Sequence, residues 1–271
     1  MSSRPIGMIV PMQDPTPFSP FAPADWRQGL SKAKVCGFDG VELAITDPHL
    51  LERSAVEEAL RSEGLRLLSI TTGQAAALEG LSLSCTDDEV RRRSVERIRA
   101  HMAFAEPFGA VVIVGSLRGA DGAREYLIES LKQCATSNDR VTIALEPLNR
   151  YESRLLNTVA ETLEVVEAVG ADNVGLLFDT FHANIEEADP AAAIGAAGSR
   201  LAHVHLADSN RWVPGYGHID FHAAERALDR IGYGGAVVLE PLLRPRPDAL
   251  LSVGGALRGS WAELPRGSTR P

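Results

Sequence analysis

Short runs of apolar residues alternate with longer segments of helical pattern along this chain. Eight runs occur, at residues 6–10, 40–43, 67–71, 110–115, 141–146, 174–179, 201–205 and 236–240. Near-continuous apolar runs of this length are typical of strands buried on both faces of a parallel sheet. Between them, apolar positions at helical spacing indicate helices at residues 25–35, 54–62, 87–105, 160–169 and 222–231. The alternation predicts an α/β fold, a (β/α)₈ barrel.

Glycines mark several junctions where a helical pattern ends and the next apolar run begins. They are Gly37, Gly64, Gly109, Gly170 and Gly232. Glycine adopts the left-handed backbone conformation that commonly closes the last turn of a helix. These junctions therefore support the helix-to-strand order of the predicted barrel.

The length of 271 residues suits one such barrel, and no Pro/Gly/Ser-rich linker interrupts the middle of the chain. We therefore expect a single domain over residues 1–271. The segment after Pro245 is rich in Pro, Gly and Ser, and we expect residues 265–271 to be a frayed tail. Hydrophobic residues make up 45% of the chain, which is enough for a large core.

Charge and cysteine content narrow the class of protein. The net charge of −9 argues against a nucleic-acid partner and favours an enzyme of small molecules. Three widely spaced cysteines indicate a reducing compartment and no disulfide framework. No apolar stretch reaches twenty residues, and the N-terminus lacks the hydrophobic region of a signal peptide. We therefore expect a cytoplasmic protein without a membrane span.

The last four apolar runs each end in a residue that can bind a metal ion: Glu146, Asp179, His205 and Glu240. In a closed parallel barrel the carboxyl ends of the strands meet on one face, where active sites form. Three carboxylates and one imidazole suit a hard divalent ion. We expect Mn²⁺, with Mg²⁺, Co²⁺ or Zn²⁺ as alternatives. The other interpretation is that these side chains cap helices or pair with arginines at the barrel mouth.

Three further polar residues follow the expected ligands at short distances. Glu152 lies six residues after Glu146, His182 three after Asp179, and Arg211 six after His205. Taken alone, His182 would be interpreted as a structural histidine and Arg211 as one partner of a surface ion pair. Their repeated placement in loops that start at an expected ligand favours contacts with a substrate.

Earlier strand ends also carry polar residues. Glu42 ends the second run, Gln74 follows the third and Arg118 follows the fourth. Each alone would be a loop or rim residue, but position on the active-site face of a barrel makes each a candidate. His203 shares the strand parity of His205, so it either supports the site from inside the barrel or belongs to the core.

Two glutamates beside a divalent ion suit proton transfer next to a ketone. Coordination of the carbonyl and of a neighbouring hydroxyl stabilises the enediolate formed when the α-proton leaves. Glu146 and Glu240 belong to separate strands and can flank the substrate, one as base and the other as acid. Return of the proton to the opposite face of the same carbon gives an epimer, whereas return to the adjacent carbon gives an aldose–ketose isomer.

Sequence motifs around these residues resemble a known superfamily. EPLNRYE, LLFDTFHANIEE, HVHLADSNRWVPGYGHIDF and VVLEP are similar, in order and spacing, to the xylose-isomerase-like TIM-barrel superfamily. Within it they resemble the ketose 3-epimerase branch, which includes D-tagatose and D-psicose 3-epimerases. The resemblance implies that Glu146, Asp179, His205 and Glu240 hold the metal and that the first and last of these transfer the proton. It also implies substrate contacts for Glu152, His182 and Arg211.

The first half resembles a narrower sub-branch that epimerises keto sugar acids and interconverts 5-keto-L-gluconate and D-tagaturonate. The similar segments are TTGQAAALEGLSLSCTDDEVRRRSVERI, which includes Gln74, and GAVVIVGSLRG, which is followed by ADGAREYL. A substrate carboxylate needs a cationic partner, and Arg118 is the candidate. The segment ADGAREYL is shorter and less basic than the loop expected for that sub-branch.

Several other functions use the same barrel. An aldose–ketose or hydroxypyruvate-type isomerase and an inosose-dehydratase-like lyase would need similar ligands. A DNA hydrolase of the endonuclease IV type needs a multi-histidine zinc cluster and a basic surface, which the scattered histidines and the net charge of −9 disfavour. A non-catalytic binding barrel would bind metal or sugar without turnover. The oligomeric state stays open, although members of this superfamily commonly associate through the barrel exterior.

Overall fold

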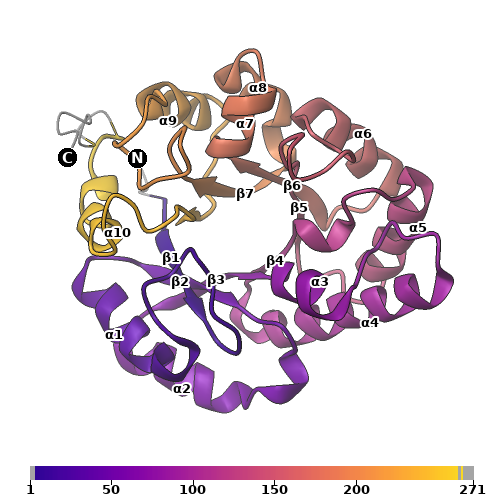
Figure 1. Cartoon of the computed structure of the whole chain (residues 1–271), viewed down its shortest axis with the longest axis horizontal. Helices are drawn as coiled ribbons and strands as arrows, with labels where there is room; N and C mark the ends of the chain where they lie inside the picture. Colours follow the sequence, from indigo (N-terminus) through magenta and orange to yellow (C-terminus); the bar gives the residue numbers. More distant parts are fainter. Residues whose placement is uncertain (1–3, 262–263, 265–271) are drawn as a thin grey trace.

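The computed structural model describes residues 4–261 and 264, and in it eight parallel strands close into one barrel. Each strand is hydrogen-bonded to the next along the chain, and β1 pairs with β8 (Figure 1). The strands are β1 (Ile6–Pro11), β2 (Gly40–Ala44), β3 (Arg66–Thr71), β4 (Val111–Val114), β5 (Ile143–Leu145), β6 (Val174–Asp179), β7 (Leu201–Leu206) and β8 (Val237–Leu239). The predicted (β/α)₈ fold is therefore confirmed.

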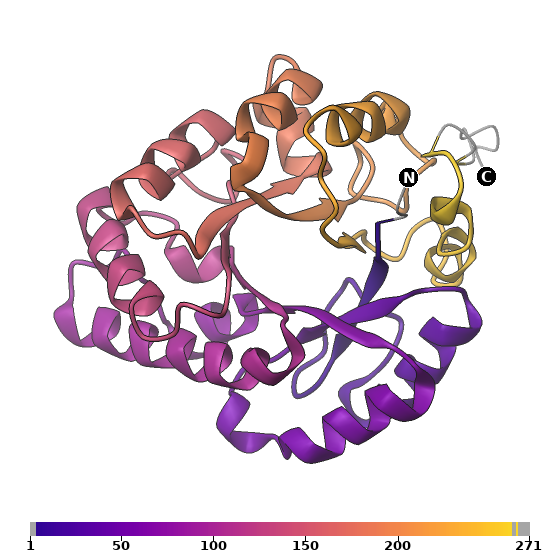
Figure 2. The ribbon, with the colours of Figure 1, turned by 180° about the vertical axis from the view of Figure 1, so that it is seen from behind.

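Helices form a ring around the barrel, seen from both sides in Figures 1 and 2. They are α1 (Trp26–Val35), α2 (Arg53–Glu63), α3 (Gly73–Glu79), α4 (Asp88–Ala105), α5 (Arg124–Ala135), α6 (Val159–Val169), α7 (Thr180–Glu186), α8 (Pro190–Ala197), α9 (Phe221–Arg230) and α10 (Ala249–Val253). Short 3₁₀ helices are η1 (Pro23–Asp25), η2 (Pro48–Leu50), η3 (Glu106–Phe108), η4 (Ser116–Arg118), η5 (Gly198–Arg200) and η6 (Ala256–Arg258). No helix among residues 4–261 is long and apolar enough to cross a membrane.

The five helices expected from periodicity are confirmed as α1, α2, α4, α6 and α9, with ends that differ by at most one residue. All five predicted junction glycines have positive φ, between 63° and 85°. The expected ranges did not include α5, which has 12 residues. They also did not include α3, α7, α8 and α10, which have only five to eight residues and too few turns for a periodic signal. The predicted tail, residues 265–271, lies outside the described residues.

The core has two layers. The large hydrophobic cluster combines strand and helix residues, such as Leu43, Ile98 and Val166, and fills the space between the barrel and its helices. Two small clusters consist mainly of strand residues and fill the barrel interior: Ile9, Ala44, Leu68 and Val238, and Ile113, Ala144 and Leu177. Buried polar residues also lie in the barrel interior. They lead toward the mouth of the barrel, where active sites form in this fold.

Candidate metal centre

The four expected metal ligands converge on one end of the barrel. One atom each from Glu146, Asp179, His205 and Glu240 lie within 4.8 Å of one another, and all four residues are buried. β5 and β8 end one residue before their glutamates, but the backbone still pairs there. Glu146 N donates to Val114 O at 3.1 Å, and Glu240 N donates to Leu206 O at 3.1 Å. Strand pairing therefore places both carboxylates at the mouth of the barrel.

Unsatisfied polar atoms in this cluster fit a bound cation. Glu146 Oε1, Asp179 Oδ2 and His205 Nδ1 are buried and have no hydrogen-bond partner. Burying polar atoms without hydrogen-bond partners costs free energy. Their convergence within one cluster therefore fits residues that could bind a cation. Asp179 does cap α7, since its Oδ1 accepts from Phe181 N at 2.6 Å. The cap uses one oxygen and leaves the other for the cluster, so these residues could hold a divalent ion.

The electrostatics of the cluster follow from packing three carboxylates together out of water. Burial raises the pKa of Glu146 well above its usual value, and the carboxylate of Glu240 adds to the effect. Burial also raises the pKa of Asp179 to about 6 against the opposing effect of Arg211. Glu240 differs, because His205 and Arg211 outweigh burial and lower its pKa. A divalent cation would offset the repulsion among these groups.

His205 lies at the centre of the cluster. Its Nδ1 is 3.4 Å from Glu240 Oε2, 3.8 Å from Glu146 Oε1 and 4.0 Å from Asp179 Oδ2. Its Nε2 points the other way, to Glu42 Oε2 at 3.1 Å. Burial would lower the pKa of His205, but the carboxylates of Glu42 and Glu240 raise it well above the usual value.

The residues expected to contact substrate form a connected group beside the cluster. His182 Nδ1 accepts from the backbone N–H of Asn149 at 3.2 Å, and its Nε2 is 4.0 Å from Glu146 Oε1. Asn149 also donates to Glu152 Oε1 at 2.9 Å through its side chain. Burial, together with Arg211, lowers the pKa of His182, so the ring is neutral. Asn149 was not identified from the sequence, although it follows Glu146 in EPLN.

Arg211 connects the group to the metal cluster. Its Nη1 donates to Glu152 Oε1 at 3.1 Å and its Nη2 donates to Glu240 Oε2 at 3.2 Å. The guanidinium lies over the rings of Phe18 and Phe181, with its Cζ 4.8 Å from each centroid. Contact with two aromatic rings restrains the planar group. Neither aromatic residue was identified from the sequence, because both are distant from Arg211 along the chain.

A cavity of about 230 Å³ opens beside these residues. Glu146, Glu152, His182, Arg211 and Glu240 line it, and so does Gln74. Gln74 donates through its amide nitrogen to Asp14 O at 2.7 Å, while its Oε1 is buried without a partner. Residues 15–18, rich in proline and carrying Phe18, cover one side of the cavity. The expected site residues other than Arg118 and Glu42 thus share this cavity or the metal cluster.

Arg118 lies away from the cavity, where it was expected to hold a substrate carboxylate. Its side chain is fully buried, and it does not line the cavity. All its guanidinium nitrogens donate within the protein. Nε donates to Glu146 O at 3.0 Å, Nη2 to Leu156 O at 3.0 Å, and Nη1 to Gly119 O and Ser153 Oγ, both at 3.2 Å. The backbone turns the side chain inward under the loop after β5, a direction that strand-end position alone cannot reveal.

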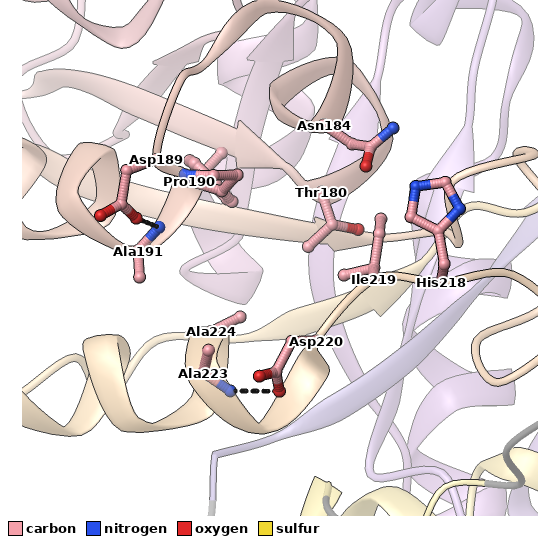
Figure 3. A pocket seen from close by; sticks show the side chains of 11 residues that line it. Thr180, Asn184, Asp189, Pro190, Ala191, His218, Ile219, Asp220, Ala223 and Ala224 are labelled. Carbon is pink, nitrogen blue, oxygen red and sulfur yellow. Dashed lines mark hydrogen bonds between the residues drawn. The ribbon is translucent and has the colours of Figure 1, made fainter.

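A second cavity of about 190 Å³ lies between α7, α8 and the start of α9 (Figure 3). Its two aspartates serve as helix caps: Asp189 accepts from Ala191 N at 3.0 Å, and Asp220 accepts from Ala223 N at 2.9 Å. His218, at its rim, is 2.9 Å from Ser209 Oγ. These two aspartates and the histidine are thus engaged, whereas Glu146 and Glu240 of the metal cluster line the first cavity.

Comparison with known proteins assigns the family. The profile of the xylose isomerase-like TIM barrel family matches residues 30–254. The chain belongs to this family. The match spans the barrel from α1 to α10, so it includes every residue of the metal cluster. The family resemblance inferred from the sequence motifs is therefore confirmed.

Relatives within the family are sugar epimerases. The chain is 32% identical to L-ribulose 3-epimerase of Mesorhizobium japonicum, over 89% of this chain and 84% of that enzyme. It is 30% identical to 3-dehydro-D-guloside 4-epimerase of Escherichia coli, over 84% and 92%. The solved structure of D-psicose 3-epimerase with D-tagatose from Clostridium cellulolyticum H10 superimposes with a TM-score of 0.75 at 27% identity, covering 98% of this chain and 93% of that one. These matches show an epimerase, an enzyme of the isomerase class.

Proposed function

We propose that this family member is a divalent-metal-dependent epimerase that inverts the carbon next to the ketone of an uncharged ketose. One observation carries the proposal: Glu146 and Glu240 belong to the metal cluster and also line the substrate-sized cavity. The names of the relatives, which include D-psicose 3-epimerase and L-ribulose 3-epimerase, support a ketose substrate.

Glu146, Asp179, His205 and Glu240 would hold the ion, and Mn²⁺ is the preferred candidate. When bound, a divalent ion supplies a Lewis acid that polarises a ketone and stabilises negative charge on its oxygen. Side chains of the protein supply the substrate contacts and the groups that transfer the proton. His182 and Arg211 line the same cavity, where they would orient substrate oxygens.

The two glutamates would move the proton. They follow β5 and β8, which are separated in the barrel by β6 and β7, so they can approach a bound ketose from different sides. One carboxylate removes the proton from the carbon next to the ketone, and the other carboxyl returns a proton to the opposite face. Arg211 holds Glu240 in place through the 3.2 Å contact from Nη2.

The charge of the cavity favours an uncharged substrate. Arg211 is the only lysine or arginine among the described residues that line it, and it already donates to Glu152 and Glu240. A sugar acid or a phosphorylated sugar would bring an anion into a cavity with three glutamates, Glu146, Glu152 and Glu240. Since Arg118 is committed to backbone carbonyls, no second cation of the cavity lining would compensate that charge.

The test is a substrate panel in D₂O followed by ¹H NMR with added Mn²⁺. It contains ketopentoses and ketohexoses, matched keto sugar acids, 3-keto glycosides, hydroxypyruvate and inososes. We expect a ketose to yield its epimer with deuterium at the inverted carbon. Turnover restricted to a sugar acid would overturn the substrate class. Loss of water from an inosose, or an aldose product from a ketose, would replace epimerisation by a different reaction.

A cytoplasmic location, a single domain over residues 1–271 and association into a homo-oligomer stay predictions. Fractionation of the producing cells, limited proteolysis and size-exclusion chromatography with light scattering test them in turn.

A further inference from the structure

Glu42 is a carboxylate buried inside the barrel, below the metal cluster. It belongs to β2 and is fully inaccessible to solvent. One of its oxygens, Oε2, accepts from Ser69 Oγ at 2.5 Å and lies 3.1 Å from His205 Nε2 and 3.3 Å from His203 Nε2. Its other oxygen, Oε1, has no partner. Burying a carboxylate in an apolar interior costs free energy, so we asked which function its contacts with Ser69, His203 and His205 could serve.

The contact with His205 determines which ring nitrogen faces the metal cluster. A carboxylate can only accept hydrogen bonds, so Nε2 at 3.1 Å must carry the proton. The lone pair of the neutral ring then lies on Nδ1, which faces Glu146, Asp179 and Glu240 and has no other partner. Only the neutral ring with its lone pair on Nδ1 can ligate a cation placed among these carboxylates.

His203 and Ser69 complete the surroundings of the Glu42 carboxylate. The ring of His203 meets that of His205 edge-on, with centroids 5.2 Å apart. Both rings and Ser69 thus hold the carboxylate against β7 while the barrel wall excludes water.

We propose that Glu42 is a positioning residue of the metal centre, which fixes the tautomer and orientation of His205. The proposal rests on the metal site proposed above. Carboxylates that accept from the outer nitrogen of a ligating histidine typically change metal affinity by about 10–100-fold when they are removed. A purely structural role for Glu42 would change folding stability and leave the affinity of the folded protein unaltered.

Mn²⁺ binding to the metal-free full chain distinguishes these roles. Glu42→Gln keeps the size and an acceptor oxygen but removes the charge, and Glu42→Leu removes both. Ser69→Ala is the matched control, because it deletes one hydrogen bond to the same oxygen and leaves the His205 contact. We expect Kd for Mn²⁺, from titration calorimetry, to rise about tenfold in Glu42→Gln and further in Glu42→Leu. Ser69→Ala should stay within about threefold of the parent chain, well below the effect of removing the carboxylate.

Two outcomes would overturn the proposal. One is an unchanged Kd in a folded Glu42→Gln variant, with any loss confined to its thermal midpoint. The other comes from the parent chain itself, so it does not depend on variants that fold. Long-range ¹H–¹⁵N NMR of the Mg²⁺-loaded protein should show His205 protonated on Nε2, and protonation on Nδ1 would contradict the inference. If the parent chain binds no Mn²⁺, or if Asp179→Asn binds it equally well, the proposed metal site fails instead.

Discussion

The guanidinium of Arg118 donates to the backbone carbonyl of Glu146 at 3.0 Å from inside the protein. The same group holds Leu156 O and Ser153 Oγ, so it ties both ends of the loop after β5 to the end of β4. Burial lowers the pKa of Arg118 to about 10, which leaves it charged at neutral pH. The Arg118 side chain, which the sequence motif suggested as a partner for a substrate carboxylate, thus supports the backbone of Glu146 in the metal cluster.

Replacing Arg118 should therefore destabilise the fold and affect all substrates alike. Arg118→Met leaves buried carbonyls without donors, so we expect the free energy of unfolding to fall by roughly 3 kcal/mol or more. Urea denaturation measures it. Arg154→Met is the control, since Arg154 forms an exposed ion pair with Asp121 and should change stability by less than about 0.5 kcal/mol. A stable Arg118→Met protein whose KM rises for a keto sugar acid alone would restore the role as an anchor.

Gly115 should be required for activity more than for stability. A Cβ at this position would meet Glu146 Oε2 inside van der Waals contact, and the three nearest atoms all belong to Glu146. Gly115→Ala therefore displaces the carboxylate of Glu146, and kcat should fall by about tenfold to a hundredfold. The midpoint of thermal unfolding reports stability. Gly195→Ala, with nothing within 4 Å of the added atom, is the matched control and should retain full activity. Equal kcat in the two variants would contradict the expected contact.

Both glutamates of the cavity should be essential. Glu146→Gln and Glu240→Gln each keep side-chain size but remove the proton-transfer group, so turnover should fall by more than about a hundredfold. Because both residues also belong to the metal cluster, the metal content of each variant has to be measured by elemental analysis and restored with excess Mn²⁺. Near-parental turnover of either variant at full metal occupancy would rule out the two-glutamate mechanism.

Metal binding should strengthen as pH rises. In the metal-free protein the pKa of Asp179 is raised to about 6 and that of Glu146 also lies above its usual value. Below these pKa values the carboxyls hold protons that a cation has to displace. We expect Kd for Mn²⁺ to increase as pH falls below about 6. The increase should be roughly tenfold per pH unit for each proton that Mn²⁺ has to displace. Calorimetry in two buffers of different ionisation enthalpy should show proton release, and an affinity independent of pH between 5 and 7 would contradict the shifts.

The strands, the barrel and the metal cluster were predictable from the sequence. Glu146, Asp179, His205 and Glu240 each end a short apolar run, and the pattern of such runs is local. Once eight parallel strands close into a barrel, chain connectivity brings their carboxyl ends to one face. The position of each ligand thus follows from local periodicity and topology, without knowledge of side-chain packing.

Only the tertiary structure decided what the neighbouring side chains contact. Glu42 and His205 are 163 residues apart in the chain, yet their facing positions inside the barrel bring them to 3.1 Å. Arg118 points under a loop, and Arg211 packs against Phe18, from the loop after β1, and against Phe181, from α7. The sequence pattern shows where a residue stands along its strand. The direction of its side chain depends on packing against distant segments, and that direction places Arg118 beneath the loop after β5 and Glu42 against His205.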